Sequence, residues 1–595
     1  MRWLQKSSDP SQVESLASAL PGKDPLVARL LVMRGITDPA EAERFLAPSL
    51  SHLHSPYLMG GMKAAVERLE AAIERKEPIL IYGDYDVDGT TAIVILKTAI
   101  ELCGGSADFH VPHRIREGYG MRDEVIERAA ANGVRLIISV DTGIRAFAAG
   151  DTAERLGIDL IVTDHHLPGQ DGVPKAFAVL NPNQPGCGYP CKALCGAGVA
   201  FKVAQALMER RLPQCDHARM LHSFMKVVAI ATIADAVPLT GENRVFAKLG
   251  LDALRSPRNV GLRSLLEVSQ LAVSRPLTAA EIAFRIAPRL NAAGRMDVAR
   301  DVIELFSVKD PERARELANR LDKLNAERQE EERRILDSIA TRVEEEPSLR
   351  EAFCVVIDGE GWHRGVIGIT ATRVVERYGR PALIISRDGE EAHGSGRSIS
   401  GFHLLDALES CSSMFSRYGG HAHAVGFALP SANVEGLRSH LDGYARARLT
   451  VADFEPSLRY DAELGLDRVT PAFFQALSAL EPFGMGNPEP VFVAHGVRLL
   501  APPRMIKDKH VKLRLAANGQ AESSGWRKAI SFDALGWQLG ERAQAAQLLP
   551  GDNIDIAFCV DHNEHPEYGG LELSLRDFQP QKAASPAGVA AAALS

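Results

Sequence analysis

Carboxylates and histidines follow three apolar segments of the chain. The apolar segments are residues 78–82, 135–140 and 159–163. The acidic and histidine side chains just beyond them are Asp84, Asp86, Asp88, Asp141, His165 and His166. Short β-favouring apolar runs next to Gly or Pro predict buried strands. Because sites in open α/β sheets form beyond the carboxyl ends of parallel strands, we expect the three loops to converge.

These side chains are of the types that bind divalent metal ions. Carboxylates with histidine and no thiolate favour Mg²⁺ or Mn²⁺. A further apolar run ends at Asp235, and the total exceeds what one ion needs, so we expect two ions about 3.5–4 Å apart. The predicted metal ligands are Asp84, Asp86, Asp88, Asp141, His165 and Asp235. Such a pair generates hydroxide at neutral pH, so the predicted reaction is hydrolysis of a phosphate ester or anhydride.

A second group of residues has the features of a phosphate site. Three glycine-rich segments, predicted as turns, cover residues 361–368, 394–398 and 419–423. Glycines let backbone N–H groups approach an anion, and each segment adds Arg, Ser or His. The candidate phosphate or DNA ligands are Arg114, Arg295, His363, Ser395, Arg397 and His421. The alternative for Arg295 and Arg397 is a structural ion pair, since such pairs also occupy clefts between domains.

Length and composition limit the classes of protein. The 595 residues exceed one core, so we expect about three to five domains. A net charge of −8 argues against a histone-like binder. No run approaches the ~18 apolar residues that span a membrane, and residues 1–6 lack a secretory signal, so we expect a cytoplasmic protein. Cys187, Cys191 and Cys195 could bind zinc, but without a compact CxxC pair we expect ordinary loop cysteines.

The patterning along the chain predicts an α/β architecture. Alternating helix and strand patterns predict a parallel sheet, a charged segment predicts a long connector helix, and short alternating strands predict a small OB-like barrel. The predicted order is a helical lead-in (1–60), the parallel-sheet domain (61–245), a helical region with the connector (246–348), a smaller α/β domain (349–452), the barrel (453–580) and a disordered tail (581–595).

The predicted barrel combines lysines with aromatic residues. Lys507, Lys509, Lys512, Arg514 and Lys528 are interleaved with Trp526 and Phe532. A single-strand-binding face requires this combination, because bases stack on aromatic rings while cations follow the backbone. The alternative is that the aromatics belong to the core and the lysines are solvated. Both remain open at this point.

The ordered motifs resemble those of the DHH phosphoesterase superfamily. Residues 86–88, Asp141, residues 164–166 and Asp235 match its successive motifs, and the three glycine-rich segments resemble its associated C-terminal domain. Residues 83–89, residues 290–295 and the barrel resemble one branch, the single-stranded-DNA exonucleases. Other branches carry a His four residues before the first metal-binding Asp, where this chain has Tyr82.

The resemblance implies a 5′→3′ exonuclease that degrades single-stranded DNA to 5′-mononucleotides in recombination and repair. From the residue types we expect that His166 either binds metal or contacts the scissile phosphate, and that the candidate phosphate ligands hold the backbone or the 5′ end. A single-strand-binding protein and a helicase are the implied partners, and we expect a monomer. The alternatives are a phosphohydrolase of short oligonucleotides or polyphosphate, and a DNA-binding scaffold without catalysis.

Overall fold

The computed structural model describes residues 1–271, 275–296, 299–517, 530–563 and 569–581. The chain forms two compact units. The central unit comprises Pro48–Glu455 and Pro482–Gly486, and the terminal unit comprises Met1–Ala47, Pro456–Glu481 and Asn487–Ser595. The predicted tail beyond residue 581, together with Trp526 and Lys528, lies outside the described residues. Within those residues, no helix has the length and apolar character needed to cross a membrane.

A parallel sheet of five strands, in the order β3-β2-β4-β5-β6, occupies the first half of the central unit. The strands are β2 (Ile79–Tyr82), β3 (Ala107–His110), β4 (Leu136–Val140), β5 (Asp159–Thr163) and β6 (Ala178–Leu180). Side chains alternate between two cores: Ile81 and Ile138 belong to one, Tyr82 and Ile137 to the other. Because both faces are buried, the central strands β2 and β4 are almost continuous apolar runs, whereas the edge strand β3 carries the exposed Asp108.

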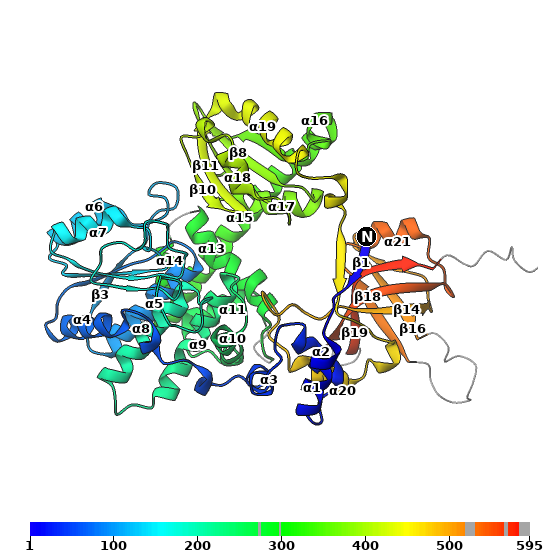
Figure 1. The fold of residues 1–595 in the computed structure, drawn as a ribbon, viewed down its shortest axis with the longest axis horizontal. Helices are drawn as coiled ribbons and strands as arrows, with labels where there is room; N and C mark the ends of the chain where they lie inside the picture. Colours follow the sequence, from blue (N-terminus) through cyan, green and yellow to red (C-terminus); the bar gives the residue numbers. More distant parts are fainter. Residues whose placement is uncertain (272–274, 297–298, 518–529, 564–568, 582–595) are drawn as a thin grey trace, which may run out of the picture. The chain divides into compact units, whose positions relative to one another are not determined.

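Helices cover both faces of this sheet, as Figure 1 shows for α6 and α7 on one side and α4 and α8 on the other. The first core contains α4 (Met62–Glu74), α5 (Val87–Leu102), α8 (Gly196–Arg211) and α9 (His217–Ala234). The second contains α6 (Asp123–Ala131) and α7 (Phe147–Arg155). The predicted parallel α/β domain is therefore confirmed.

A helical region joins this sheet to a second one. Its elements are α10 (Gly241–Ala253), α11 (Val260–Val268), α12 (Ala279–Glu281), the π-helix η3 (Ile282–Ile286), α13 (Ala287–Met296), α14 (Arg300–Ser307), α15 (Pro311–Glu345) and α16 (Pro347–Arg350). The predicted connector is α15, capped by Asp310, whose carboxylate accepts from the N–H groups of Glu312 and Arg313. One face of α15 is buried, with Leu321 in the first core and Ile339 in the core of the second sheet.

The second sheet has the order β10-β11-β9-β8-β7, with only β7 and β8 parallel among its described pairs. Its strands are β7 (Val355–Glu360), β8 (Ala382–Asp388), β9 (Glu391–Arg397), β10 (Arg417–His421) and β11 (Ala424–Pro430). The helices α17 (Ile367–Tyr378), α18 (Leu404–Glu409) and α19 (Val434–Arg446) pack on it.

Two of the three glycine-rich segments are strands, so their prediction as turns was wrong. Residues 394–397 lie in β9 and residues 419–421 in β10. At Gly394 a Cβ atom would lie 2.0 Å from the ring of Phe427 on the paired strand. Glycine is needed there for a close packing contact, not to reverse the chain, and the sequence pattern alone does not separate these two uses.

The terminal unit is an OB-like barrel that incorporates the N-terminal segment. Its elements are β1 (Arg2–Gln5), α1 (Pro10–Ala19), α2 (Pro25–Val32), α3 (Pro39–Leu46), β12 (Ser457–Tyr460), β13 (Ala462–Glu463), α20 (Pro471–Ser478), β14 (Phe492–Leu499), β15 (Arg504–Ile506), β16 (His510–Ala516), β17 (Ser531–Gly536), α21 (Gly540–Ala546), β18 (Asn553–Asn563) and β19 (Gly570–Pro580). Pairing of β14 with β16 closes the predicted barrel. β1 pairs in parallel with β12, and Trp3 donates to the buried Asp577. Phe532 is buried, which favours the core alternative for this aromatic.

Candidate metal centre and phosphate site

The predicted acidic and histidine side chains converge at one end of the parallel sheet. Asp84 and Asp86 follow β2, Asp141 follows β4 and His165 follows β5. The remaining two come from helices: Asp88 lies in the first turn of α5, and Asp235 caps the C-terminus of α9. We call Asp84, Asp86, Asp88, Asp141, His165 and Asp235 the carboxylate cluster.

His165 lies at the centre of the carboxylate cluster. Its Nε2 atom is 3.2 Å from Asp141 Oδ1 and 3.8 Å from a carboxylate oxygen of both Asp88 and Asp235. Three triplets of residues can be formed in which the potential ligand atoms lie within 4.8 Å of one another. The triplets are Asp84–Asp86–Asp141, Asp88–His165–Asp235 and Asp141–His165–His166. The first two share no residue, so the cluster has enough ligands for two neighbouring ions.

Backbone geometry fixes Asp88 and Asp141. The two oxygens of Asp88 accept hydrogen bonds from the N–H groups of Gly196 (2.6 Å) and Ala197 (2.8 Å), at the N-terminus of α8. Asp141 adopts φ +59°, a left-handed conformation that is rare outside glycine. A Cβ atom on Gly196 would lie 2.5 Å from Asp141 Oδ1. Glycine at the start of α8 therefore lets both carboxylates reach the same place.

Asp164, His165 and His166, which we call the DHH segment, differ in the contacts that their side chains make. Asp164 is fully buried, and its Oδ1 accepts from the backbone N–H groups of His165 and His166, while Oδ2 accepts from Ile144 N–H. His166 Nδ1 lies 2.8 Å from the same Oδ1, so Nδ1 donates and Nε2 stays available. Burial alone would raise the pKa of Asp164, but the hydrogen bonds from His166 and Ile144 lower it below its ordinary value. Asp164 is thus an ionised positioning residue with its oxygens occupied.

Two asparagines that sequence reasoning missed hold the backbone of the histidine pair. Asn181 donates to the carbonyl oxygen of His166, and Asn183 donates to that of His165, each at 2.8 Å. Both follow β6, the neighbour of β5. The available signal was their position: an Asn-Pro-Asn segment directly after an apolar run is also at a strand end.

Burial makes the carboxylate cluster electrostatically unfavourable without a cation. Burial and the neighbouring carboxylates raise the pKa of Asp84 and Asp141 well above the ordinary value, and burial, followed by repulsion from Asp88, raises that of Asp235 to about 9. Burial also raises the pKa of Asp88. Burial lowers the pKa of His165, which favours the neutral imidazole that binds metals.

The cluster fits a divalent-metal site. Asp84 Oδ1 and Asp141 Oδ1 are buried, and neither accepts a well-oriented hydrogen bond from the described residues, although His165 Nε2 lies 3.2 Å from Asp141 Oδ1. A buried polar atom without a partner is unfavourable by about 1–3 kcal/mol, and a metal ion would satisfy both oxygens. Oxygen ligands with one imidazole suit Mn²⁺ or Mg²⁺. In the described part of the chain no triplet of potential ligands contains a cysteine, which leaves the zinc alternative without support.

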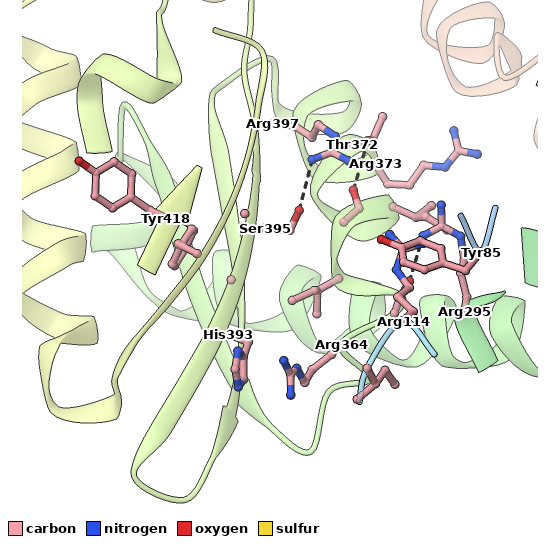
Figure 2. Close-up of a pocket in the computed structure, with 18 of the residues that line it drawn as sticks. Tyr85, Arg114, Arg295, Arg364, Thr372, Arg373, His393, Ser395, Arg397 and Tyr418 are labelled. Atoms are coloured by element: carbon pink, nitrogen blue, oxygen red, sulfur yellow. Dashed lines mark hydrogen bonds between the residues drawn. The ribbon is translucent and has the colours of Figure 1, made fainter. Parts of the chain in front are cut away.

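A cavity of about 700 Å³ lies beside the carboxylate cluster and is lined by cationic side chains (Figure 2). We call it the cationic cavity. Tyr85, between Asp84 and Asp86 in sequence, lines it and carries the guanidinium of Arg114 over its ring at 4.6 Å. The arginines in its lining are Arg114, Arg295, Arg364, Arg373, Arg397 and Arg417.

Four of the six candidate phosphate ligands line the cationic cavity: Arg114, Arg295, Ser395 and Arg397. The other two lie elsewhere. His363 lines a separate cavity of about 450 Å³. Its Nδ1 accepts a hydrogen bond from Gly365 N–H. His421 is an exposed residue of β10 and is not among the residues that line the cationic cavity.

Two of the cavity arginines, Arg295 and Arg397, are held by neutral partners. Arg295 donates to the carbonyl oxygen of Gly365, and Arg397 donates to Ser395 Oγ and to the carbonyl oxygen of Gly396. Burial and repulsion from Arg114 lower the pKa of Arg295 to about 9 and also lower that of Arg397. Among the described residues neither forms an ion pair with a carboxylate, whereas Arg373, also in the lining, pairs with Glu332 and Glu376. This favours an anion site over structural ion pairs.

Helix α13 links the two sites. Val87 N–H donates to Asn291 Oδ1 at 3.1 Å, and a Cβ atom on Gly294 would lie 2.2 Å from the carbonyl oxygen of Tyr85. The helix therefore packs directly on the acidic loop, with Arg295 following Gly294. Arg364, Arg373 and Arg417 were not predicted as cavity residues, because only the folded chain brings this loop, helix and strand residue together.

Comparisons with known proteins agree with this organisation. Residues 78–232 match the DHH family, N-terminal domain, residues 351–447 the DHHA1 domain, and residues 460–577 the RecJ OB domain. The single-stranded-DNA-specific exonuclease RecJ of Bacillus subtilis (strain 168) is 37% identical over 580 residues, covering 97% of this chain and 70% of that protein. The protein of the same name from Dickeya dadantii (strain 3937) is 36% identical over 590 residues, covering 96% and 98%.

A solved structure matches as well. The crystal structure of RecJ in complex with Mn²⁺ from Thermus thermophilus aligns with a TM-score of 0.81 at 29% identity, over 98% of this chain and 80% of that chain. The resemblance to the DHH phosphoesterases and the fold that it implied are confirmed. The similarity extends over nearly the whole chain. The chain therefore belongs to the RecJ family of single-stranded-DNA-specific exonucleases.

Proposed function

We propose that the chain is a metal-dependent exonuclease that degrades single-stranded DNA from its 5′ end to 5′-mononucleotides, in DNA recombination and repair. The observation that carries the proposal is the juxtaposition of the carboxylate cluster with the cationic cavity, linked through Tyr85. One site attracts cations and the other anions. A phosphodiester needs both at once, because its phosphate must be held while a nucleophile is generated beside it.

We propose that the carboxylate cluster holds two Mn²⁺ or Mg²⁺ ions. The buried oxygens of Asp84 and Asp141 that accept no well-oriented hydrogen bond from the described residues support this assignment, as does the manganese complex of the T. thermophilus relative. When bound, such a pair supplies hydroxide at neutral pH and stabilises the attacking and leaving oxygens at phosphorus. The N-terminus of α8 holds the ligand Asp88 and Asn183 holds the backbone of the ligand His165, so little reorganisation is needed during the reaction.

Residues of the cationic cavity, together with His166, would hold the DNA. Arg295, Ser395 and Arg397 bind phosphate oxygens in the cationic cavity, and the guanidinium groups do so in the bidentate geometry that suits phosphate. His166 has an available Nε2 and a half-exposed ring, so it contacts the scissile phosphate. Burial lowers the pKa of His166, but its hydrogen bond to Asp164 and the charge of that residue raise it above the ordinary value. The imidazolium would then donate to a phosphate oxygen.

The barrel and the partners complete the proposal. The match to the RecJ OB domain supports a second contact with single-stranded DNA. We extend the proposal to a cytoplasmic monomer that receives 5′ ends from a helicase and meets a single-strand-binding protein on its substrate; this part rests on the resemblance alone.

A single oligonucleotide labelled at either end tests the proposed function. With Mn²⁺ or Mg²⁺, the 5′ label should appear first as a mononucleotide while the 3′-labelled strand shortens stepwise. Blunt duplex and EDTA samples should show no products. Loss from the 3′ end would overturn the polarity, and an intact strand in the presence of metal would overturn the nuclease assignment. Cleavage of pyrophosphate or a dinucleotide alone would favour the phosphohydrolase alternative.

A further inference from the structure

Exposed apolar side chains border the cationic cavity. Phe284 is 74% exposed, Tyr418 38% and Ile115 36%, and all three line the cavity together with its arginines. They come from separate elements: Phe284 from the π-helix η3, Tyr418 from β10 and Ile115 from the loop after β3. An exposed large apolar residue by itself needs no explanation. Three around one anion-binding cavity form a surface that combines cations with apolar side chains.

Phe284 has the most unusual position of the three. It lies in the middle of η3, a run of five π-helical residues, flanked by the fully buried Ile282 and Ile286. π-helical segments are rare in proteins, and those that occur are often found at functional sites. The buried neighbours anchor η3 in the core, and Arg285 is held by the carbonyl oxygen of Gln270 at 3.0 Å. The segment is therefore fixed, and it presents a phenyl ring to solvent at the cavity.

The chemistry of single-stranded DNA matches this combination. Its phosphates are anionic, and its bases are unpaired and have exposed aromatic faces. Proteins that bind single strands without sequence preference join a cationic groove to side chains on which bases stack, because every base offers such a face. An exonuclease that removes successive nucleotides must accept all four bases. Hydrogen bonding to base edges would discriminate among them, whereas stacking would not.

We infer that Phe284 stacks on a nucleobase of the strand whose phosphates occupy the cationic cavity. The inference rests on the proposed function, and it assigns to Phe284 the role of a substrate-positioning residue. Ile115, next to the phosphate ligand Arg114, and Tyr418 extend the apolar border. The stacked base fixes the orientation of the sugar, and thereby the position of the phosphate that enters the carboxylate cluster.

Binding of single-stranded DNA by Phe284→Ala tests the inference. Measured in EDTA, so that the strand stays intact, affinity should fall about 5- to 150-fold, the range for loss of one base–aromatic stack. The salt dependence of binding should not change, because no cation is removed. Phe284→Trp should bind at least as tightly as the wild type. Phe177→Ala is the matched control, since Phe177 is also an exposed phenylalanine (48%) but does not line the cavity.

Oligonucleotides with a single abasic nucleotide, placed in turn at each position near the 5′ end, separate stacking from other effects. At one position the wild type should lose as much affinity as Phe284→Ala does on the intact strand, and Phe284→Ala should lose nothing further there. An equal Phe284→Ala effect at every abasic position, or no effect of Phe284→Ala on intact DNA, would overturn the inference. Cleavage of the intact strand by the wild type is measured in parallel with Mn²⁺. Its absence would refute the proposed function instead.

Discussion

Binding of Mn²⁺ to the metal-free protein should release protons, because the carboxylate cluster retains them. The pKa of Asp235 is about 9, against an ordinary value of 3.8, owing to burial and then to repulsion from Asp88 and Asp86. At about pH 7.5 this carboxyl group is therefore protonated without metal. A carboxylate must lose its proton to coordinate an ion, so binding and proton release are coupled.

The size of the effect follows from this shift in pKa. One proton released per binding event changes the apparent metal affinity tenfold per pH unit, which corresponds to about 1.4 kcal/mol. Between about pH 6.5 and pH 8.5, Asp235 alone should strengthen Mn²⁺ binding about 100-fold, or about 2.7 kcal/mol. The raised pKa values of Asp84 and Asp141 act in the same direction.

Calorimetric titration with Mn²⁺ in buffers of different ionisation enthalpy counts the released protons. At about pH 7.5 we expect at least one proton per protein. Asp235→Asn keeps the size of the side chain but cannot titrate, so its count should be lower by about one. Zero released protons in the wild type, or an unchanged count in Asp235→Asn, would show that the carboxylates are already ionised and would refute the electrostatic reasoning.

Other perturbations separate the roles of individual residues and of the solution pH. In the metal-free protein a raised carboxyl pKa means that the folded state keeps a proton that the unfolded state has lost. Raising the pH from about 7 to about 8.5 should therefore lower the free energy of unfolding by about 2 kcal/mol for each retained proton. Urea titration measures this decrease, and saturating Mn²⁺ should suppress it. Asp164→Asn leaves a buried N–H group without an acceptor, so it should lower the free energy of unfolding by about 1–3 kcal/mol and slow hydrolysis. If the variant unfolds at the same urea concentration as the wild type, the positioning role of Asp164 is contradicted. Gly196→Ala places a methyl group against Asp141 and should weaken Mn²⁺ binding about 10- to 100-fold, with Gly198→Ala, where no atom lies closer than 3.5 Å, as the control. Arg397→Ala should weaken DNA binding and reduce the slope of log K against log salt by about 0.7; an unchanged slope would remove Arg397 from the phosphate contacts.

The convergence of the carboxylate cluster could be predicted because several of its residues follow a strong local signal. A buried parallel strand is a continuous apolar run, so Asp141 and His165 stand out as polar residues directly after such runs. Topology then requires that the ends of neighbouring strands meet. The positioning role of Asp164 was not predictable, because only the folded chain shows that both of its carboxylate oxygens accept hydrogen bonds from backbone N–H groups.

Long-range packing limited the rest of the prediction. Gly394 and Phe427 are 33 positions apart, and no local pattern indicates that the ring occupies the space of a missing side chain. Likewise, β1 pairs with β12 across more than 450 residues, so the N-terminal segment belongs to the same unit as the barrel. The cavity arginines come from β9 and β10, from α17 and the loop before it, from α13 and from the loop after β3, and only the folded chain brings them together.

The most direct test of the account compares binding and hydrolysis of single-stranded DNA by Asp141→Ala. Asp141 belongs to the carboxylate cluster, whereas the residues that we propose as phosphate ligands line the cationic cavity. We expect hydrolysis at saturating DNA and Mn²⁺ to be abolished, while the affinity for the strand, measured in EDTA, stays within a fewfold of the wild type. Hydrolysis at a rate close to that of the wild type, or an equal loss of binding and cleavage, would contradict the division of the site into a metal centre and a phosphate-binding cavity.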